Sequence, residues 1–372
     1  MNLSASGYRF REAKFDELEG WTADDPTPLF PALRNCIDHI RSVKPYRKGA
    51  LGLSAEDLVS IAEALPDSLP DNPAAARSFF EQHFQPFFIE EANGSKGLVT
   101  AFYEPEIAVS AMPDTEFKYP IYARPADLVD IDDNQAAEHL QPGYRFARSN
   151  DGRLEPYPDR RSIDLGYLEG KGLELAWAKS KVDLFFVHIQ GAARLRFPDG
   201  TISRITYSAK AGHPFSAIGK LLVDRGQVPA SEISMQSIRK WLAEHPDEVD
   251  EVLWHNRSYI FFKEVEVGDL TSGPIAAAKV PLVAGRSLAV DREIHTFGFP
   301  FFVHSKTLTH LDDGHPFGRL MLALDTGSAI VGPARGDIFT GSGFAAGELA
   351  GTVRNAADFY ILIPKSVAKR YR

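Results

Sequence analysis

The chain has 372 residues, of which 44% are apolar and 24% charged, a composition typical of a soluble globular protein with about two domains. Its 41 basic and 50 acidic side chains give a net charge of −9, which argues against a general nucleic-acid-binding protein, since such proteins usually carry a basic excess. The single cysteine, Cys36, excludes an intrachain disulfide and a cysteine-based zinc cluster, and we expect it to be a core thiol. No run of 18 apolar residues occurs, so we expect no membrane span, and no signal peptide or lipobox is visible.

The first hundred residues have the pattern of helices followed by one strand. Ser54 and Asp57 resemble a capping box ahead of a helix that reaches Leu65 and stops at Pro66. A second helix is predicted from Pro73 through Phe80, with proline at its first position. Residues 97–105 then predict a strand that ends in a proline turn.

The middle of the chain combines predicted strands with a group of helices. The apolar run 182–190 has strand length. Residues 194–197 and 201–207 flank the turn Pro198-Asp199-Gly200 and predict a hairpin. Helices are then predicted at 214–223, 231–244 and 247–254.

The last part is again rich in short strands separated by Gly, Pro and Asp, which favours a barrel over a βαβ sheet. No glycine-rich nucleotide-binding motif is present. The strands are predicted at 259–262, 287–290, 301–303, 320–324, 329–331 and 359–363.

The densest candidate site is the glycine-rich stretch 324–343, which contains Asp325 and Asp337. A third aspartate, Asp291, follows the predicted strand 287–290. Three carboxylates that meet could tune one another's pKa, so that one stays protonated as a general acid. Spacing alone also fits aspartates that only cap turns, and it does not show that the three meet.

Two other kinds of site find little support. Four histidines fall between 295 and 315, but none has zinc-ligand spacing. Asp325-Thr-Gly matches the motif of aspartic proteases, which need a second copy or a dimer, and no second copy occurs. Aromatic residues such as Tyr103 and Tyr122 could stack on sugar rings, although ordinary core packing explains most of them.

Several short motifs stand out between residues 98 and 364: 100–105 (TAFYEP), 119–122 (YPIY), 187–191 (VHIQG), 210–213 (KAGH), 218–226 (IGKLLVDRG), 234–239 (SMQSIR) and 323–327 (ALDTG). Taken together, these stretches resemble the MltA family of lytic murein transglycosylases, and they follow in the family's order. The C-terminal part resembles its three-aspartate domain, with Asp291, Asp325 and Asp337 in the three places.

The resemblance implies a mainly β fold with flanking helices. A double-psi β-barrel domain would be assembled from residues 1–104 and 246–372. A smaller inserted β-barrel domain, residues 105–245, would lie between them in sequence, and a groove between the two domains would hold a glycan strand.

The implied reaction, which we expect to need no metal or other cofactor, is that of a peptidoglycan lytic exotransglycosylase. Cleavage of the β-1,4 bond between N-acetylmuramic acid and N-acetylglucosamine leaves a 1,6-anhydro end. Asp337 would act as acid and then as base, with Asp325 supporting it. Substrate binding is expected for Thr100, Tyr103, Gln190, Gly191, Lys210 and Asp291. The implied setting is the periplasm or outer membrane, as a monomer able to join cell-wall synthesis complexes.

Two alternatives stay open. Glu104 stands where the family's first motif usually has threonine, so a hydrolase with two carboxylates is conceivable if Glu104 or Asp325 assists Asp337. A non-catalytic glycan-binding protein would use the aspartates only to bind sugar hydroxyls.

Overall fold

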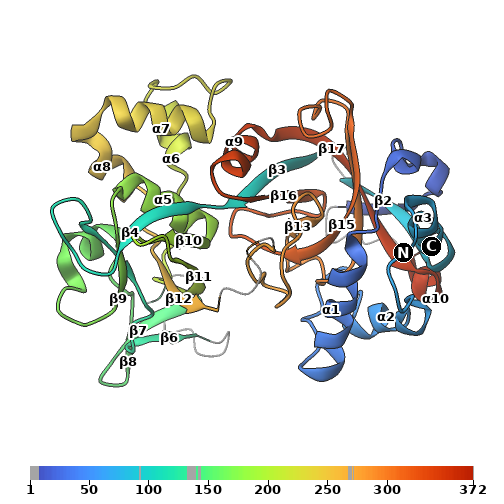
Figure 1. Ribbon diagram of the computed structural model, residues 1–372, viewed down its shortest axis with the longest axis horizontal. Helices are drawn as coiled ribbons and strands as arrows, with labels where there is room; N and C mark the ends of the chain where they lie inside the picture. Colours follow the sequence, from blue (N-terminus) through green and yellow to red (C-terminus); the bar gives the residue numbers. More distant parts are fainter. Residues whose placement is uncertain are drawn as a thin grey trace. The chain divides into compact units, whose positions relative to one another are not determined.

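The computed structural model describes residues 8–91, 94–131, 140, 144–266, 270 and 272–371, and the chain forms two compact units (Figure 1). Unit 1 comprises Met1–Tyr103, Thr271–Gly341 and Thr352–Arg372; unit 2 comprises Glu104–Leu270 and Ser342–Gly351. Unit 2 therefore extends past the expected boundary at 245, because the strand that follows its helices still pairs within it.

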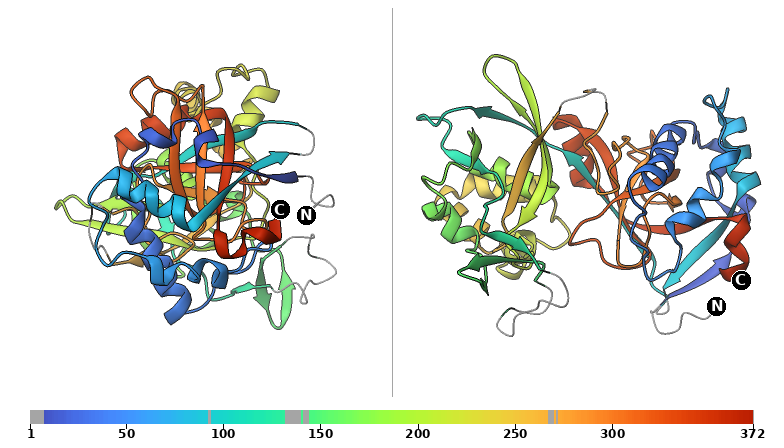
Figure 2. Two further views of the ribbon diagram at one scale, coloured as in Figure 1. Left: turned by 90° about the vertical axis from the view of Figure 1, so that its right-hand side faces the viewer. Right: turned by 90° about the horizontal axis from the view of Figure 1, so that it is seen from below.

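Unit 1 is built around one mixed sheet, whose strands stand side by side in the left view of Figure 2. The strand order is β1-β2-β17-β14-β15-β13-β16-β3, and β17 also pairs with β3, so six strands pair in a closed ring. Within it, β13 and β15 are parallel. The strands are β1 (Tyr8–Glu12), β2 (Phe84–Glu91), β3 (Gly97–Glu104), β13 (Ser287–Val290), β14 (Pro300–Ser305), β15 (Phe317–Asp325), β16 (Arg335–Ser342) and β17 (Arg354–Pro364).

Helices flank this sheet, and α1 packs against β15. Ser54 and Asp57 form the predicted capping box, and Asn72 caps α3 by accepting from the Ala75 amide at 2.9 Å. Cys36 is a buried core thiol, as predicted. The helices are α1 (Leu29–Ser42), α2 (Ala55–Val59), α3 (Pro73–His83) and α10 (Lys365–Ala368), with 3-10 turns at Phe15–Glu17, Trp21–Ala23, Ala62–Ala64 and Lys369–Tyr371.

Unit 2 contains a six-stranded sheet of order β12-β11-β10-β4-β9-β5 and a three-stranded sheet β6-β7-β8. A bridge between Ala123 and Phe262 links the two ends of the larger sheet. The predicted hairpin is confirmed as β10 and β11. The strands are β4 (Glu106–Ser110), β5 (Tyr119–Tyr122), β6 (Leu128–Asp130), β7 (Phe146–Asn150), β8 (Arg153–Glu155), β9 (Glu174–Ala178), β10 (Ala192–Arg196), β11 (Ile202–Lys210) and β12 (Ile260–Val265).

Within unit 2, α5 (Lys181–Gln190), α6 (Ile218–Asp224), α7 (Met235–Glu244) and α8 (Val249–Trp254) share a separate apolar cluster that includes Phe185, Leu222 and Trp241. The unit also contains α4 (Arg160–Ser162) and α9 (Phe344–Thr352, whose last residue belongs to unit 1), with a π-turn at Ile163–Tyr167 and a 3-10 turn at Pro246–Glu248.

Two predicted strands are not strands in the structure, and one strand of the structure was not predicted. The run 182–190 is helix α5 and not a strand, because Ser180 caps its first turn and Gly191 ends it in the left-handed conformation. Residues 329–331 form part of a turn, whereas 335–342, for which no strand was predicted, is strand β16.

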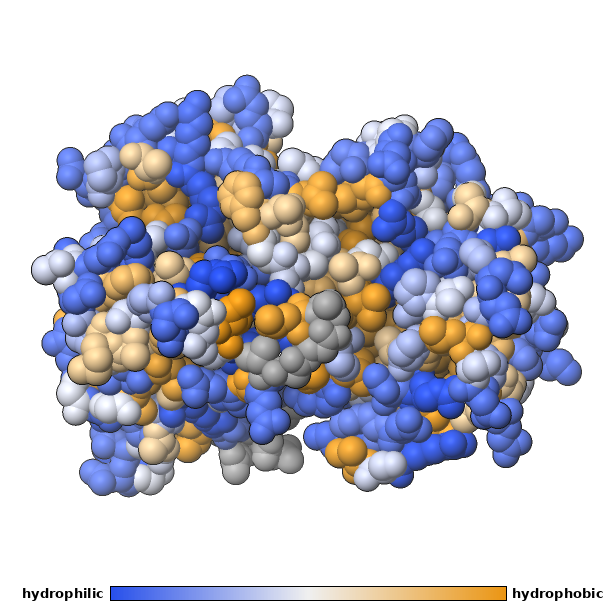
Figure 3. Space-filling model, in the orientation of Figure 1, coloured by the Kyte–Doolittle hydropathy of each residue, from blue (hydrophilic) through white to orange (hydrophobic). Residues whose placement is uncertain are grey.

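Apolar residues that remain at the surface form separate patches among polar ones on the face shown in Figure 3.

Candidate active site

The register of three strands in unit 1 places two of the predicted aspartates in one row. Ala289 on β13 lies opposite Asp325 on β15 and opposite Asp337 on β16. Directly opposed residues of neighbouring strands point to the same face of a sheet. With strands about 4.8 Å apart, the two aspartate Cα atoms are about 10 Å apart. The sheet therefore presents two carboxylates on one face.

Two side chains, those of Arg335 and Thr100, hold the carboxylate of Asp337. Arg335 and Asp337 lie two residues apart on β16, which puts them on the same face. The Arg335 Nη1 donates to Asp337 Oδ1 at 2.5 Å, and its Nη2 donates to Thr100 Oγ1 at 2.8 Å. The Thr100 hydroxyl in turn donates to Asp337 Oδ1. Thr100 comes from β3, the neighbour of β16 in the sheet.

Asp325 is partly buried at the end of β15, where its Oδ1 accepts from the Ala277 amide at 3.1 Å. Burial raises the pKa of this carboxyl to about 6, and the negative charge of Asp337 contributes in the same direction. Unlike the carboxylate of Asp337, the side chain of Asp325 has no ion-pair partner within 4 Å among the described residues. Asp325 is therefore more easily protonated than an ordinary aspartate.

This environment predicts a pH-dependent effect of Asp325→Asn on stability. A carboxyl whose pKa is raised by folding stabilises the folded state only when it is protonated, so wild-type stability falls as pH rises from about 4 to 6. We expect the asparagine to raise the free energy of unfolding of unit 1 at pH 7.5 by about 1–2 kcal/mol and to change it little at pH 4. Urea unfolding at both pH values, with the exposed Asp67→Asn as control, measures this; an equal change at both pH values would contradict it.

Asp291 holds the loop that leads into β16. It is buried, and its two carboxylate oxygens accept from the backbone amides of Glu293 and Gly332, at 3.0 and 2.8 Å. His295 adds a bond from Nε2 to the Pro333 carbonyl at 2.8 Å, and burial lowers its pKa to about 4, so the ring is neutral. These contacts fix the backbone immediately before Arg335.

Glu104, the alternative second carboxylate, makes ion pairs and a hydrogen bond with side chains of unit 2. Its buried side chain pairs with Arg194 at 2.9 Å and with Arg204 at 2.7 Å, and it accepts from Ser342 Oγ at 2.6 Å. A carboxylate that already pairs with two guanidinium groups, one of them buried, is poorly suited to attack a sugar. Glu104 is thus a structural ion in this arrangement.

The chain matches two family models: the MltA specific insert domain over residues 98–263 and the 3D domain over residues 286–363. The structure is similar to the crystal structure of membrane-bound lytic murein transglycosylase from Agrobacterium tumefaciens, at 63% identity and a TM-score of 0.93, covering 98% of this chain and 100% of that one. The chain belongs to the MltA family.

More distant members of the MltA family agree. The structure of E. coli MltA with bound chitohexaose has 28% identity and a TM-score of 0.69, covering 91% of this chain and 90% of that one. Membrane-bound lytic murein transglycosylase A of E. coli K12 is 34% identical over 71% of this chain, and the match spans 64% of that relative's length. Within the described residues, no helix combines the length and apolar character needed to cross a bilayer.

The other site residues predicted from the MltA resemblance are distributed over both units. Tyr103 is buried near the end of β3 in unit 1. In unit 2, Gln190 and Gly191 form the C-terminus of α5, and the Gly191 carbonyl accepts from the Tyr207 amide at 2.7 Å. Lys210 ends β11, and burial lowers the pKa of its ammonium group.

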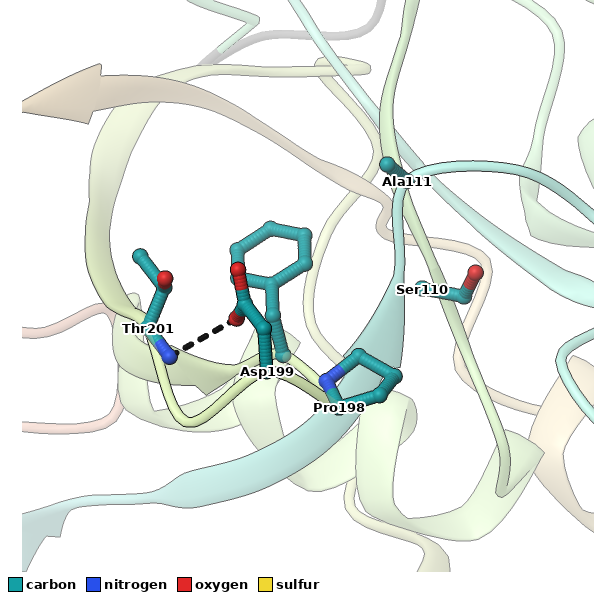
Figure 4. A pocket seen from close by; sticks show the side chains of 6 residues that line it. Ser110, Ala111, Pro198, Asp199 and Thr201 are labelled. Carbon is teal, nitrogen blue, oxygen red and sulfur yellow. Dashed lines mark hydrogen bonds between the residues drawn. The ribbon is translucent and has the colours of Figure 1, made fainter.

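A shallow hollow at the hairpin turn of unit 2 lies apart from these residues. Figure 4 shows Asp199 beside it with one carboxylate oxygen accepting from the Thr201 amide, at 2.8 Å. No predicted site residue lines it. The carboxylate that lines it, Asp199, already accepts the hydrogen bond that closes the turn, so the hollow has no evident group for acid–base catalysis among its lining residues.

Sequence reasoning missed Arg335, which touches the Asp337 carboxylate directly. Period-two spacing from Asp337 would have placed it on the same face if 335–342 had been recognised as a strand. No group of three or more His, Cys, Asp or Glu side chains suited to a metal was found in the part of the chain that the structure describes.

Proposed function

We propose that this protein is a lytic transglycosylase that acts on peptidoglycan glycan strands. It cleaves the β-1,4 bond between N-acetylmuramic acid and N-acetylglucosamine without water and leaves 1,6-anhydro-N-acetylmuramic acid ends. The observation that carries the proposal is the environment of Asp337. Thr100 and Arg335 hold its carboxylate by hydrogen bonds, and Asp325 lies on the same face of the sheet, across Ala289. Family membership and the names of the relatives support the substrate class.

One carboxyl group is enough for this reaction. Asp337 first gives a proton to the glycosidic oxygen as the bond to the muramic acid C1 breaks. The C6 hydroxyl of the same sugar then attacks C1 and returns its proton to Asp337. Because this nucleophile is tethered to the reacting ring, its effective concentration is very high. Asp325 lies on the same face and supports positive charge at C1 when it is ionised.

We also propose the domain architecture, the glycan-binding residues and the location that the relatives suggest. The closed ring of six strands in unit 1 supports a double-psi β-barrel, and the bridged ends of the large sheet in unit 2 support a smaller inserted barrel. Tyr103, Gln190, Gly191 and Lys210 are proposed to bind glycan. The relatives are named membrane-bound, which supports a periplasmic or outer-membrane-associated location. We further propose that the protein acts as a monomer that can join cell-wall synthesis complexes.

One observation favours hydrolysis as a second candidate. Inverting glycosidases keep their two carboxyl groups about 6.5–9.5 Å apart to admit a water, and the row of Asp325 and Asp337 has backbone spacing of about 10 Å. In that case Asp325 would activate the water. Glu104 does not serve this purpose because Arg194 and Arg204 occupy it.

The product distinguishes these activities. We expect mass spectrometry of soluble products from purified sacculi to show muropeptides one water lighter than hydrolytic ones, ending in 1,6-anhydro-muramic acid, because the C6 hydroxyl replaces water. Reducing ends would establish the hydrolase instead. Binding to sacculi without soluble products would contradict both enzymes and leave a glycan-binding protein.

A further inference from the structure

We propose that Arg335 is a positioning residue that, through Thr100, fixes which oxygen of Asp337 carries the catalytic proton. The inference rests on the proposed transglycosylase function and concerns a residue that makes an ion pair with the acid. Arg335 leads strand β16, and its side chain is only 14% exposed. Its guanidinium is therefore held inside the site and is not a mobile surface charge.

The direction of each hydrogen bond follows from what each group can donate. Arginine has only donors, so Thr100 Oγ1 must accept from Arg335 Nη2, at 2.8 Å. The single hydrogen of Thr100 is then directed to Asp337 Oδ1. Arg335 Nη1 donates to the same Oδ1 at 2.5 Å and to the Gly336 carbonyl at 2.7 Å.

Two donors thus converge on one oxygen of Asp337. An oxygen that accepts from two donors has no room for a proton of its own, so the acid proton must sit on Oδ2. Among the described residues, none of the hydrogen bonds involving Asp337 uses Oδ2. Oδ2 is therefore the oxygen that gives its proton to the glycosidic oxygen and later takes one from the C6 hydroxyl.

The planar fork of Arg335 suits this task. Its Nη1 and Nη2 act on two groups at once, and a lysine ammonium cannot reproduce both directions. The hydrogen bonds among these three side chains form a closed network: Arg335 orients Thr100, and both orient Asp337. Misplacing an acid by a small distance costs rate without removing substrate contacts.

The test measures the initial rate of anhydro-muropeptide release against glycan concentration for Arg335→Gln, Arg335→Lys, Thr100→Val and Thr100→Ser. We expect Arg335→Gln to lower kcat about 100-fold with KM and sacculus binding within about three-fold of wild type. Arg335→Lys should recover only part of this loss. Thr100→Ser, which keeps the hydroxyl, should be at least about five-fold faster than Thr100→Val.

Arg47 forms an exposed ion pair with Glu293 in unit 1, so Arg47→Gln is the matched control and should leave kcat unchanged. Near-normal kcat in Arg335→Gln, or equal rates for Thr100→Ser and Thr100→Val, would overturn the proposal. So would a rise in KM at constant kcat, which indicates substrate binding instead. Failure of the function itself would appear separately, as wild-type protein that forms no anhydro ends.

Discussion

Asp337→Asn is expected to lower the initial rate of glycan cleavage by at least about 1,000-fold while binding to sacculi persists. The amide has nearly the size of the carboxyl group, and its oxygen can still accept from Thr100 and Arg335. It can neither give a proton to the glycosidic oxygen nor take one from the C6 hydroxyl. Release of soluble muropeptides measures the rate, and sedimentation with purified sacculi measures binding.

Asp114→Asn is the matched control for this substitution. Asp114 closes an exposed turn in unit 2 by accepting from the Glu116 and Phe117 amides, which asparagine can also do. Its rate should equal that of wild type. If Asp337→Asn keeps more than about a tenth of wild-type activity, Asp337 is not the acid, and Asp325, whose pKa is raised to about 6, becomes the next residue to examine.

Glu104→Ala is expected to destabilise unit 2 by about 3–5 kcal/mol, the largest stability effect we predict for a single substitution. Glu104 is buried, and so is Arg204; both this arginine and Arg194 would lose their charge partner. Leaving buried guanidinium groups without a carboxylate costs far more than the original pairing gained. Urea unfolding followed by tryptophan fluorescence gives the free energy.

Glu106→Ala provides the control two residues away. Its partner Arg196 is half exposed, so the loss should be below about 1 kcal/mol. Equal losses in the two variants would show that burial of Glu104 does not determine its effect. Replacing Glu104, Arg194 and Arg204 together by Leu, Met and Met should restore much of the stability, since no uncompensated charge remains.

Local signals in the sequence predicted much of the fold. The Ser54 capping box, the Asn72–Pro73 helix start and the Pro198–Gly200 hairpin turn are all present. The run 182–190 was assigned to a strand because a short apolar run does not distinguish a strand from a buried helix. Ser180 and Asp183, spaced as a helix cap, carried the missing signal.

The candidate site was predicted only in part. The glycine-rich stretch 324–343 indicated Asp325 and Asp337, and the resemblance added Thr100. Strand register is a long-range property, so the placement of the two aspartates opposite Ala289 could not be derived from spacing. Arg335 was missed with its strand. Glu104 was considered a groove carboxylate, because the sequence does not show that two distant arginines enclose it.

The pairing of β3 with β16 and β17 has a consequence for biosynthesis. Thr100 and Asp337 are separated by 237 residues of sequence, most of which form the other unit. Contacts of such long sequence separation form late, because the entropy of closing the loop must be overcome first. A nascent chain that ends before β16 contains neither Arg335 nor Asp337, so under the proposed function a ribosome-bound fragment of that length lacks the catalytic acid. The order of elements along the polypeptide would then delay cleavage of the cell wall until nearly the whole chain has been made.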